Sequence, residues 1–183
     1  MKVFSFSLIV IVVLAVTGYL VWSTISLNIR SVTKGPVHYH ADFEIYNCGE
    51  KVDLADPTGW DNKVGTSLFH EHNDSRIHVE GPVLDYKDIS LGQFFKVVDG
   101  LPLESGIECN SYPGVVQVFV YKTEGNTFYQ EKITDYANYV LSPYSSIPPG
   151  DCIIIELDRE KDKTEHICNF YKIAIQKGEL IER

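Results

Sequence analysis

Histidine residues are crowded into two short segments in the first half of the chain. Five of the six histidines fall between positions 38 and 78, and these are His38, His40, His70, His72 and His78. Imidazole nitrogens are favoured ligands of Zn²⁺ and Cu²⁺, whereas Ca²⁺ and Mg²⁺ prefer oxygen ligands. The single methionine, Met1, leaves no methionine-rich site for copper(I). The residue types therefore predict a centre for Zn or Cu(II) built from these five side chains.

The spacing of the first histidine pair suits a β-strand. In VHYHADFEIY, residues 37–46, apolar and polar residues alternate along the whole segment, which predicts a half-buried strand. Side chains two residues apart on a strand point to the same face. His38 and His40 are therefore expected to be neighbours, with Asp42 and Glu44 continuing the same row.

The second histidine segment, FHEHNDSRIHVEG, repeats the H-x-H spacing and adds a third imidazole. SRIHVEGPV, residues 75–83, predicts another strand with His78 and Glu80 on its polar face. We expect at least three of the five histidines to converge on one ion. Asp74 or Glu80 is expected either to bind the ion or to hydrogen-bond to one of its ligands.

Three other functions are compatible with the sequence. A metal-dependent hydrolase needs an open position for water and a carboxylate base; Glu80 or Asp74 could be that base, because Glu71 is expected on the opposite side of its strand. A cysteine-nucleophile, protease-like hydrolase would instead pair Cys48 or Cys109 with a histidine. A metal-free protein-interaction module would use the histidines only as the polar face of its strands.

Three segments together resemble a group of prokaryotic membrane-anchored proteins without an established activity. The segments are HYHADFEIYNCGEKVDL, FHEHNDSRIHVEGP and ISLGQFF, all between residues 36 and 98. That group is similar in its H-x-H strand, its H-x-H-[DN] segment followed by I-H-[VI]-E, and its L-G-x-F-F element. The resemblance implies a membrane segment followed by a folded domain, and it implies no particular chemistry.

The beginning of the chain has the composition of a membrane segment. Residues 4–27 contain no charged side chain and consist mostly of Val, Ile, Leu and Phe. At about 1.5 Å rise per residue, such a helix can cross a hydrocarbon core of roughly 30 Å. The run is longer than the apolar part of a secretory signal peptide, about 7–15 residues, and no clear A-x-A cleavage pattern follows it. We predict an uncleaved signal-anchor over residues 1–30, with a cleaved signal as the alternative, and a linker over residues 31–36.

The cysteines and the net charge indicate the compartment and the partners. The even set of four cysteines contains no C-x-x-C pair and comprises Cys48, Cys109, Cys152 and Cys168. Two disulfides in an oxidising compartment are expected, with four buried thiols as the alternative, so an extracytoplasmic domain is favoured. The formal net charge of −9 argues against nucleic acid. The expected partners are the membrane, through the N-terminal helix, and a second protein if the domain is an interaction module.

The soluble part, residues 37–183, is expected to be rich in β-strands. GVVQVFVYKT and NTFYQEKIT predict a hairpin, and residues 152–157 are apolar enough for a central strand. DISLGQFFKVVDG has helical spacing, with Ser90 as the N-cap, whereas residues 165–176 fit a strand or a helix. These elements predict an α+β fold, sandwich-like or β-grasp-like, with two subdomains meeting near residue 105 as an option.

Overall fold

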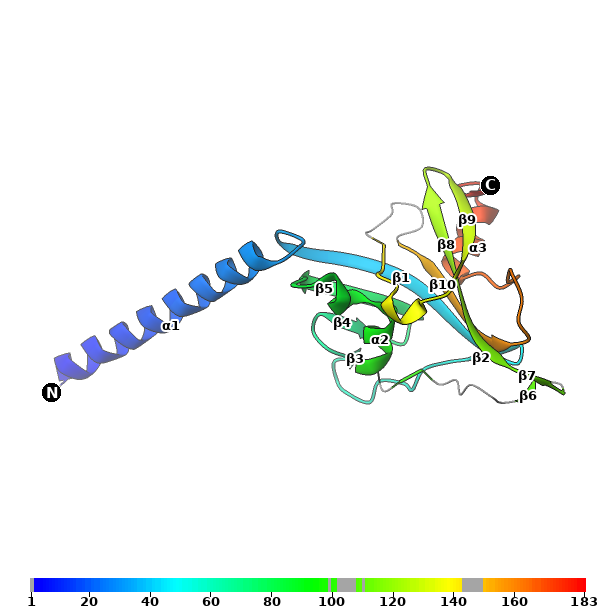
Figure 1. The fold of residues 1–183 in the computed structure, drawn as a ribbon. Coiled ribbons are helices and arrows are strands. Elements are labelled where there is room, and N and C mark those ends of the chain that lie inside the picture. Colours follow the sequence, from blue (N-terminus) through cyan, green and yellow to red (C-terminus); the bar gives the residue numbers. More distant parts are fainter. Residues whose placement is uncertain (1, 99, 102–107, 110, 143–149) are drawn as a thin grey trace.

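A long N-terminal helix projects away from a β-rich domain (Figure 1). The part of the chain that the computed structural model describes comprises residues 2–98, 100–101, 108–109, 111–142 and 150–183. The helix, α1, runs over Lys2–Arg30. Its stretch Phe6–Arg30 is long and apolar enough to cross a membrane, and none of it is buried in the domain.

Strand β1, Pro36–Asn47, is the spine of the main sheet. Its first half pairs antiparallel with β5, Arg76–Pro82, and its second half pairs parallel with β10, Cys152–Asp158. A turn at Cys48 and Gly49 leads into β2, Glu50–Val52, which pairs with the end of β1. Both turn residues have positive φ angles, 51° and 88°, as a tight two-residue hairpin turn requires.

The other strands extend the sheet on both sides of this spine. The order of the main sheet is β11-β9-β8-β10-β1-β5-β4-β3. The strands not yet introduced are β3 (Val64–Gly65), β4 (Phe69–Glu71), β8 (Val115–Glu124), β9 (Thr127–Ile133) and β11 (Ile181–Glu182). A separate two-stranded ribbon is formed by β6 (Glu108–Cys109) and β7 (Tyr112–Pro113). The hairpin predicted from the sequence is the pair β8–β9.

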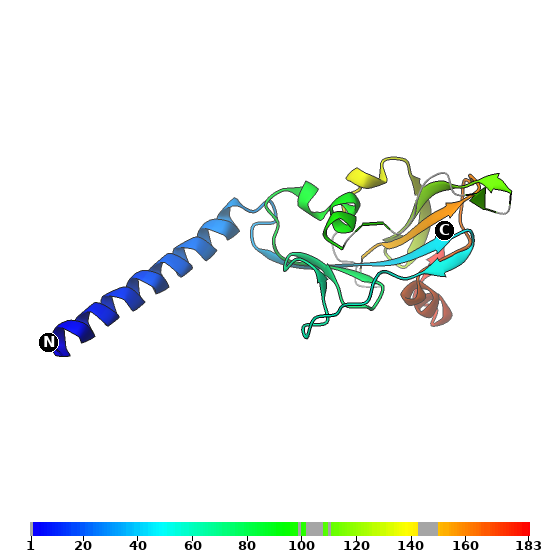
Figure 2. The same ribbon diagram turned by 90° about the horizontal axis from the view of Figure 1, so that it is seen from below.

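Helices cover both faces of the sheet (Figure 2). On one face lies α2, Leu91–Val97, whose Phe94 ring contacts the Phe43 ring of β1 at a centroid distance of 5.6 Å. On the other face lies α3, Asn169–Gln176, whose Tyr171 is fully buried. Because apolar clusters form on both sides, β10 is buried on both of its faces.

Two short helical elements complete the description. The 3-10 helices η1 and η2 cover Tyr86–Ile89 and Tyr136–Asn138. Ser90 is the N-cap of α2, because its hydroxyl accepts a hydrogen bond from the Gln93 N–H at 3.3 Å. The N-cap predicted from the sequence is therefore confirmed.

Hydrogen bonds order the segment between α1 and β1. The Val32 N–H donates to Val83 O at 2.8 Å, and the Val83 N–H donates to the Thr33 hydroxyl at 3.3 Å. Ser31 is buried, and its hydroxyl accepts from the Gly35 N–H at 3.0 Å. The predicted linker thus attaches the end of α1 to the residue that follows β5.

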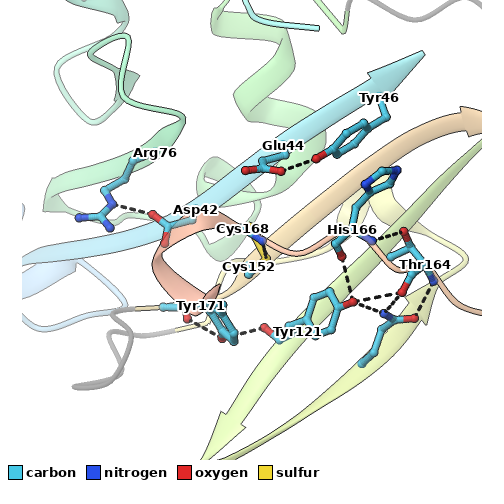
Figure 3. The surroundings of a disulfide bond; sticks show 12 residues. Asp42, Glu44, Tyr46, Arg76, Tyr121, Cys152, Thr164, His166, Cys168 and Tyr171 are labelled. Atoms are coloured by element: carbon cyan, nitrogen blue, oxygen red, sulfur yellow. Dashed lines mark hydrogen bonds and ion pairs between the residues drawn. A yellow bond between two sulfur atoms is a disulfide. The ribbon is translucent and has the colours of Figure 1, made fainter. Parts of the chain in front are cut away.

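All four cysteines form disulfides. Cys48 is bonded to Cys109, which connects the end of β1 to β6. Cys152 is bonded to Cys168, which connects the start of β10 to the residue before α3 (Figure 3). The prediction of two disulfides is confirmed. Neither Cys48 nor Cys109 retains the thiol that a cysteine-nucleophile hydrolase requires, and that hypothesis is set aside.

The predicted α+β, β-rich class is confirmed. Apart from the β6–β7 ribbon, the described strands form one mixed sheet with helices on both faces, so the two stacked sheets of a sandwich do not describe it. The segment that fitted a strand or a helix contains α3. Residue 105 lies outside the described residues, and strands that precede and follow it belong to the same main sheet.

Candidate metal centre

Three neighbouring strands bring the histidines together. On β1 and β5, His40 lies opposite His78; on β5 and β4, His78 lies opposite His70. Neighbouring strands are about 4.8 Å apart, so these three residues form a row across the sheet. His38 occupies a nearby register position, opposite Glu80. We refer to His38, His40, His70, His72 and His78 as the histidine cluster.

His78 lies in the middle of the cluster. Its ring centroid is 4.8 Å from that of His40, 5.0 Å from that of His72 and 5.4 Å from that of His70. The centroids of His38 and His40 are 4.5 Å apart, and those of His70 and His72 are 4.8 Å apart. The five histidines singled out in the sequence therefore gather at one place in the fold.

The cluster occupies the sheet face opposite to α2. The residues that alternate with the histidines, including Tyr39, Ile77 and Val79, pack into the core on the α2 side. Exposure falls across the cluster: the side chain of His38 is 62% exposed, whereas that of His70 is only 2% exposed. The centre is thus open at one edge and buried at the other.

Two groups of three side chains have the spacing of candidate metal ligands. One group is His38, His40 and His78, and the other is His70, His78 and Glu80; within each group, the ligand atoms lie within 4.8 Å of one another. In a tetrahedral zinc site with bonds of about 2.1 Å, ligand atoms are about 3.4 Å apart. Small side-chain rotations would therefore close either group around an ion.

Hydrogen bonding determines which ring nitrogen of His72 is available. Its Nδ1 lies 2.6 Å from Asn62 O. A carbonyl oxygen can only accept, so Nδ1 carries the proton and Nε2 keeps its lone pair. Asn62 in turn donates from Nδ2 to His72 O at 3.0 Å. A backbone carbonyl on the distal nitrogen is a common partner of metal-binding histidines.

Asp74 orients His78 in a comparable way. The His78 Nε2–H donates to Asp74 Oδ2 at 3.2 Å, which leaves Nδ1 for a metal. Asp74 is positioned by Glu71, whose Oε1 accepts the backbone N–H groups of Asp74 at 2.7 Å and Ser75 at 3.2 Å. Glu71 therefore organises the turn between β4 and β5 and belongs to neither group of candidate ligands.

Burial keeps two imidazoles of the cluster neutral. Desolvation, followed by the effects of His78, His38 and Arg76, lowers the pKa of His40 from 6.5 to about 4. Burial also lowers the pKa of His70, although the carboxylate of Glu80 opposes this shift. Neutral imidazole is the form that binds metal ions. Both side chains are therefore ready to bind at neutral pH.

The polar row along β1 changes character after His40. Asp42 is buried and accepts a hydrogen bond from Arg76 Nε at 2.7 Å. Glu44 is buried and accepts from the Tyr46 hydroxyl at 2.5 Å (Figure 3). These carboxylates continue the row, as the alternation predicted, but they are paired within the protein and do not join the cluster.

Sequence reasoning missed the contribution of Asn62. It acts through a backbone carbonyl, and the type of its side chain gives no signal for that role. The sixth histidine, His166, lies apart from the cluster and stacks on the Tyr46 ring at a centroid distance of 3.6 Å.

These observations define an α+β domain with a histidine centre that could hold a metal ion, preceded by a helix that could span a membrane. Comparison of the chain with known protein families, with curated proteins and with solved structures finds no match. The functional argument therefore depends on the geometry of the centre itself.

Proposed function

We propose that this protein binds a divalent transition metal, Zn²⁺ or Cu²⁺, at the histidine cluster. The observation that carries the proposal is the cross-strand row of His40, His78 and His70, which produces two three-ligand groups that share His78. Imidazole and carboxylate ligands together favour these two ions.

The burial of His70 argues against a merely solvated strand face. Its side chain is 2% exposed, and Nδ1 is buried without a hydrogen-bond partner among the described residues. Leaving a polar group buried and unpaired costs about 1–3 kcal/mol. A metal ion bonded to His70 Nε2, the nitrogen that lies 3.9 Å from Glu80 Oε2, would offset part of the hydration that this ring loses on folding and would leave Nδ1 unpaired.

The site is proposed to lie in an extracytoplasmic, membrane-anchored domain. The support is the apolar helix α1 together with two disulfides, which form in oxidising compartments. The proposed membership in the group of prokaryotic membrane-anchored proteins rests on the H-x-H and I-H-[VI]-E segments. Those segments are the ones that supply the cluster.

A metal-dependent hydrolase is the second candidate, because Asp74, which contacts His78, also lines a cavity. The cavity has a volume of about 360 Å³, and its lining includes Asp42, Asp74 and Phe170. Asp74 also accepts the hydrogen bond from His78, so a substrate in the cavity would lie beside the centre. Hydrolysis of a chromogenic ester by the zinc-loaded protein, absent from a His78→Ala variant, would support this candidate.

Metal content tests the main proposal. The full chain is purified in detergent without a histidine tag, loaded with zinc or copper, separated from unbound metal and measured by mass spectrometry. We expect at least one bound ion per chain in the wild type and in a His166→Ala control, and less bound metal in His78→Ala. An ion present at 100 times its Kd would also stabilise the domain by about 2.7 kcal/mol. No bound metal and no thermal shift on adding either ion would overturn the proposal.

A further inference from the structure

The histidine cluster contains more ligands than one ion uses. A structural zinc ion takes four protein ligands, and a catalytic zinc ion takes three. The cluster supplies five imidazoles, and Glu80 adds a carboxylate to one of the candidate groups.

The ligands are distributed on the two sides of β5. His38 and His40 come from β1, whereas His70 comes from β4 and His72 directly follows it. His78 lies between the two pairs on β5. Among the described residues, neither candidate group contains a histidine from both β1 and β4. Both groups contain His78, so they define one position on each side of this residue.

Glu80 spans these two positions. Its Oε1 lies 3.2 Å from His38 Nε2, and its Oε2 lies 3.9 Å from His70 Nε2. Ligand atoms bound to the same tetrahedral zinc ion are about 3.4 Å apart. Each oxygen of Glu80 is thus near the spacing expected of a co-ligand, one with a histidine of β1 and the other with a histidine of β4.

We propose that the centre binds two divalent ions joined by the Glu80 carboxylate. The first ion is held by His38, His40 and His78. The second is held by His70 and Glu80, with His72, whose ring centroid lies 4.8 Å from that of His70, as the third ligand in place of the shared His78. The other oxygen of Glu80 faces the first ion. This inference rests on the proposed function, since it requires that the cluster binds metal.

The hydrogen bonds of the rings are compatible with this division. The Asn62 carbonyl holds the proton of His72 on Nδ1 and leaves Nε2 for the second ion. Asp74 holds the proton of His78 on Nε2 and leaves Nδ1 for the first ion. Each ion would therefore have one ligand whose tautomer is already fixed by a partner outside the metal site.

Copper stoichiometry tests the proposal directly. The full chain in detergent is stripped of metal, titrated with Cu²⁺ and separated from unbound copper, and the bound copper is counted by native mass spectrometry. We expect two ions per wild-type chain. Electron paramagnetic resonance should give an integrated signal below the total copper, because two neighbouring Cu²⁺ ions couple magnetically.

Variants locate the two ions. His38→Ala/His40→Ala and His70→Ala/His72→Ala should each retain one copper, with a signal that accounts for all of it. Glu80→Gln should weaken magnetic coupling or lower the stoichiometry, whereas His166→Ala should behave as the wild type.

The possible results separate the two proposals. One copper per wild-type chain would overturn the two-ion inference and leave the proposed function standing. No copper in any form would overturn both. A double variant that still holds two ions would show that the second ion binds elsewhere and would also overturn the inference.

Discussion

The polar side chains at the two ends of one sheet face differ in how completely they are hydrogen-bonded. At the end covered by α3, Gln130 Nε2 donates to the Tyr121 hydroxyl at 2.5 Å and to Thr164 O at 2.9 Å, while its Oε1 accepts from the Thr164 N–H at 3.0 Å. At the histidine end, His70 Nδ1 is buried and has no partner among the described residues. The Gln130 side chain is therefore hydrogen-bonded through both of its polar atoms, whereas the buried His70 ring has an unpaired nitrogen.

This difference is the one expected between polar residues that stabilise the fold and polar residues that are proposed to bind an ion. Buried polar groups in folded proteins are nearly always hydrogen-bonded, so a buried exception needs its own explanation. Near α3 the Gln130 side chain has partners within the chain for both its nitrogen and its oxygen, and these bonds hold Thr164 in the segment before the helix. In the histidine cluster, ligand atoms of three side chains lie within 4.8 Å of one another in each of two groups, a spacing that an ion could complete.

Truncation of Tyr171 should have the largest effect, and it should be confined to stability. This ring is fully buried, and its hydroxyl donates to Tyr121 O at 3.0 Å and Gly150 O at 3.2 Å. Tyr171→Ala should lower the free energy of unfolding by about 3–5 kcal/mol, measured by urea denaturation. Tyr171→Phe should lose only about 1 kcal/mol and bind metal as tightly as the wild type. Weaker metal binding by Tyr171→Phe would contradict the separation of the two ends.

Gly150→Ala should be the next most damaging change, and it should affect both ends. A Cβ at Gly150 would lie 1.5 Å from His40 O, and its φ is +81°. Since the conflict is with backbone, we expect a loss of about 2–4 kcal/mol in stability, together with weaker metal binding as His40 is displaced. Gly125→Ala is the matched control, because its φ is +65° but its Cβ would meet nothing within 4 Å. Equal effects of the two variants would show that contact with His40 is unimportant.

Asp74→Asn should act only at the histidine end. The substitution weakens the hydrogen bond from His78 Nε2, and the loss of such a partner typically lowers metal affinity 10–100-fold. Titration calorimetry with zinc would measure the affinity, and urea denaturation without metal should show little change. Asp162→Asn, at an exposed position, is the control. An unchanged affinity for Asp74→Asn would exclude Asp74 as the residue that orients His78.

The pH dependence of the metal-free protein should be the smallest effect. The pKa of His40 is about 4 in the folded protein and 6.5 by default, so between these values the unfolded chain binds more protons. The contribution of His40 to the free energy of unfolding is fully present above pH 6.5 and is lost as the pH falls towards 4. Burial raises the pKa of Asp42. This carboxyl group therefore contributes in the opposite direction, since its effect lowers the free energy of unfolding as the pH rises above 3.8. Urea midpoints should fall between pH 7 and pH 4.5, and less so in His40→Gln.

The strands that carry the cluster were predictable, but their register was not. Alternation fixed the faces of His38 and His40 from local sequence alone, and the turn residues around β8–β9 predicted that hairpin. The pairing of His40 with His78 joins positions far apart in the chain, and no local pattern encodes it. The segment before and within α3 remained ambiguous because its aromatic and β-branched residues suit either structure; in the fold, the bond from Cys168 to Cys152 and the burial of Tyr171 accompany the helix.

The attachment of Val32 to Val83 has a consequence for the position of the centre. Five residues of extended chain separate His78 from Val83, a distance of about 17 Å at roughly 3.3 Å per residue. If α1 lies in a bilayer, the hydrogen bonds that join Val32 and Thr33 to Val83 keep the end of β5 next to the end of the membrane helix. The histidine cluster would then lie within about 17 Å of extended strand from the membrane-proximal end of the domain, so its ligands would have to reach it close to the membrane surface.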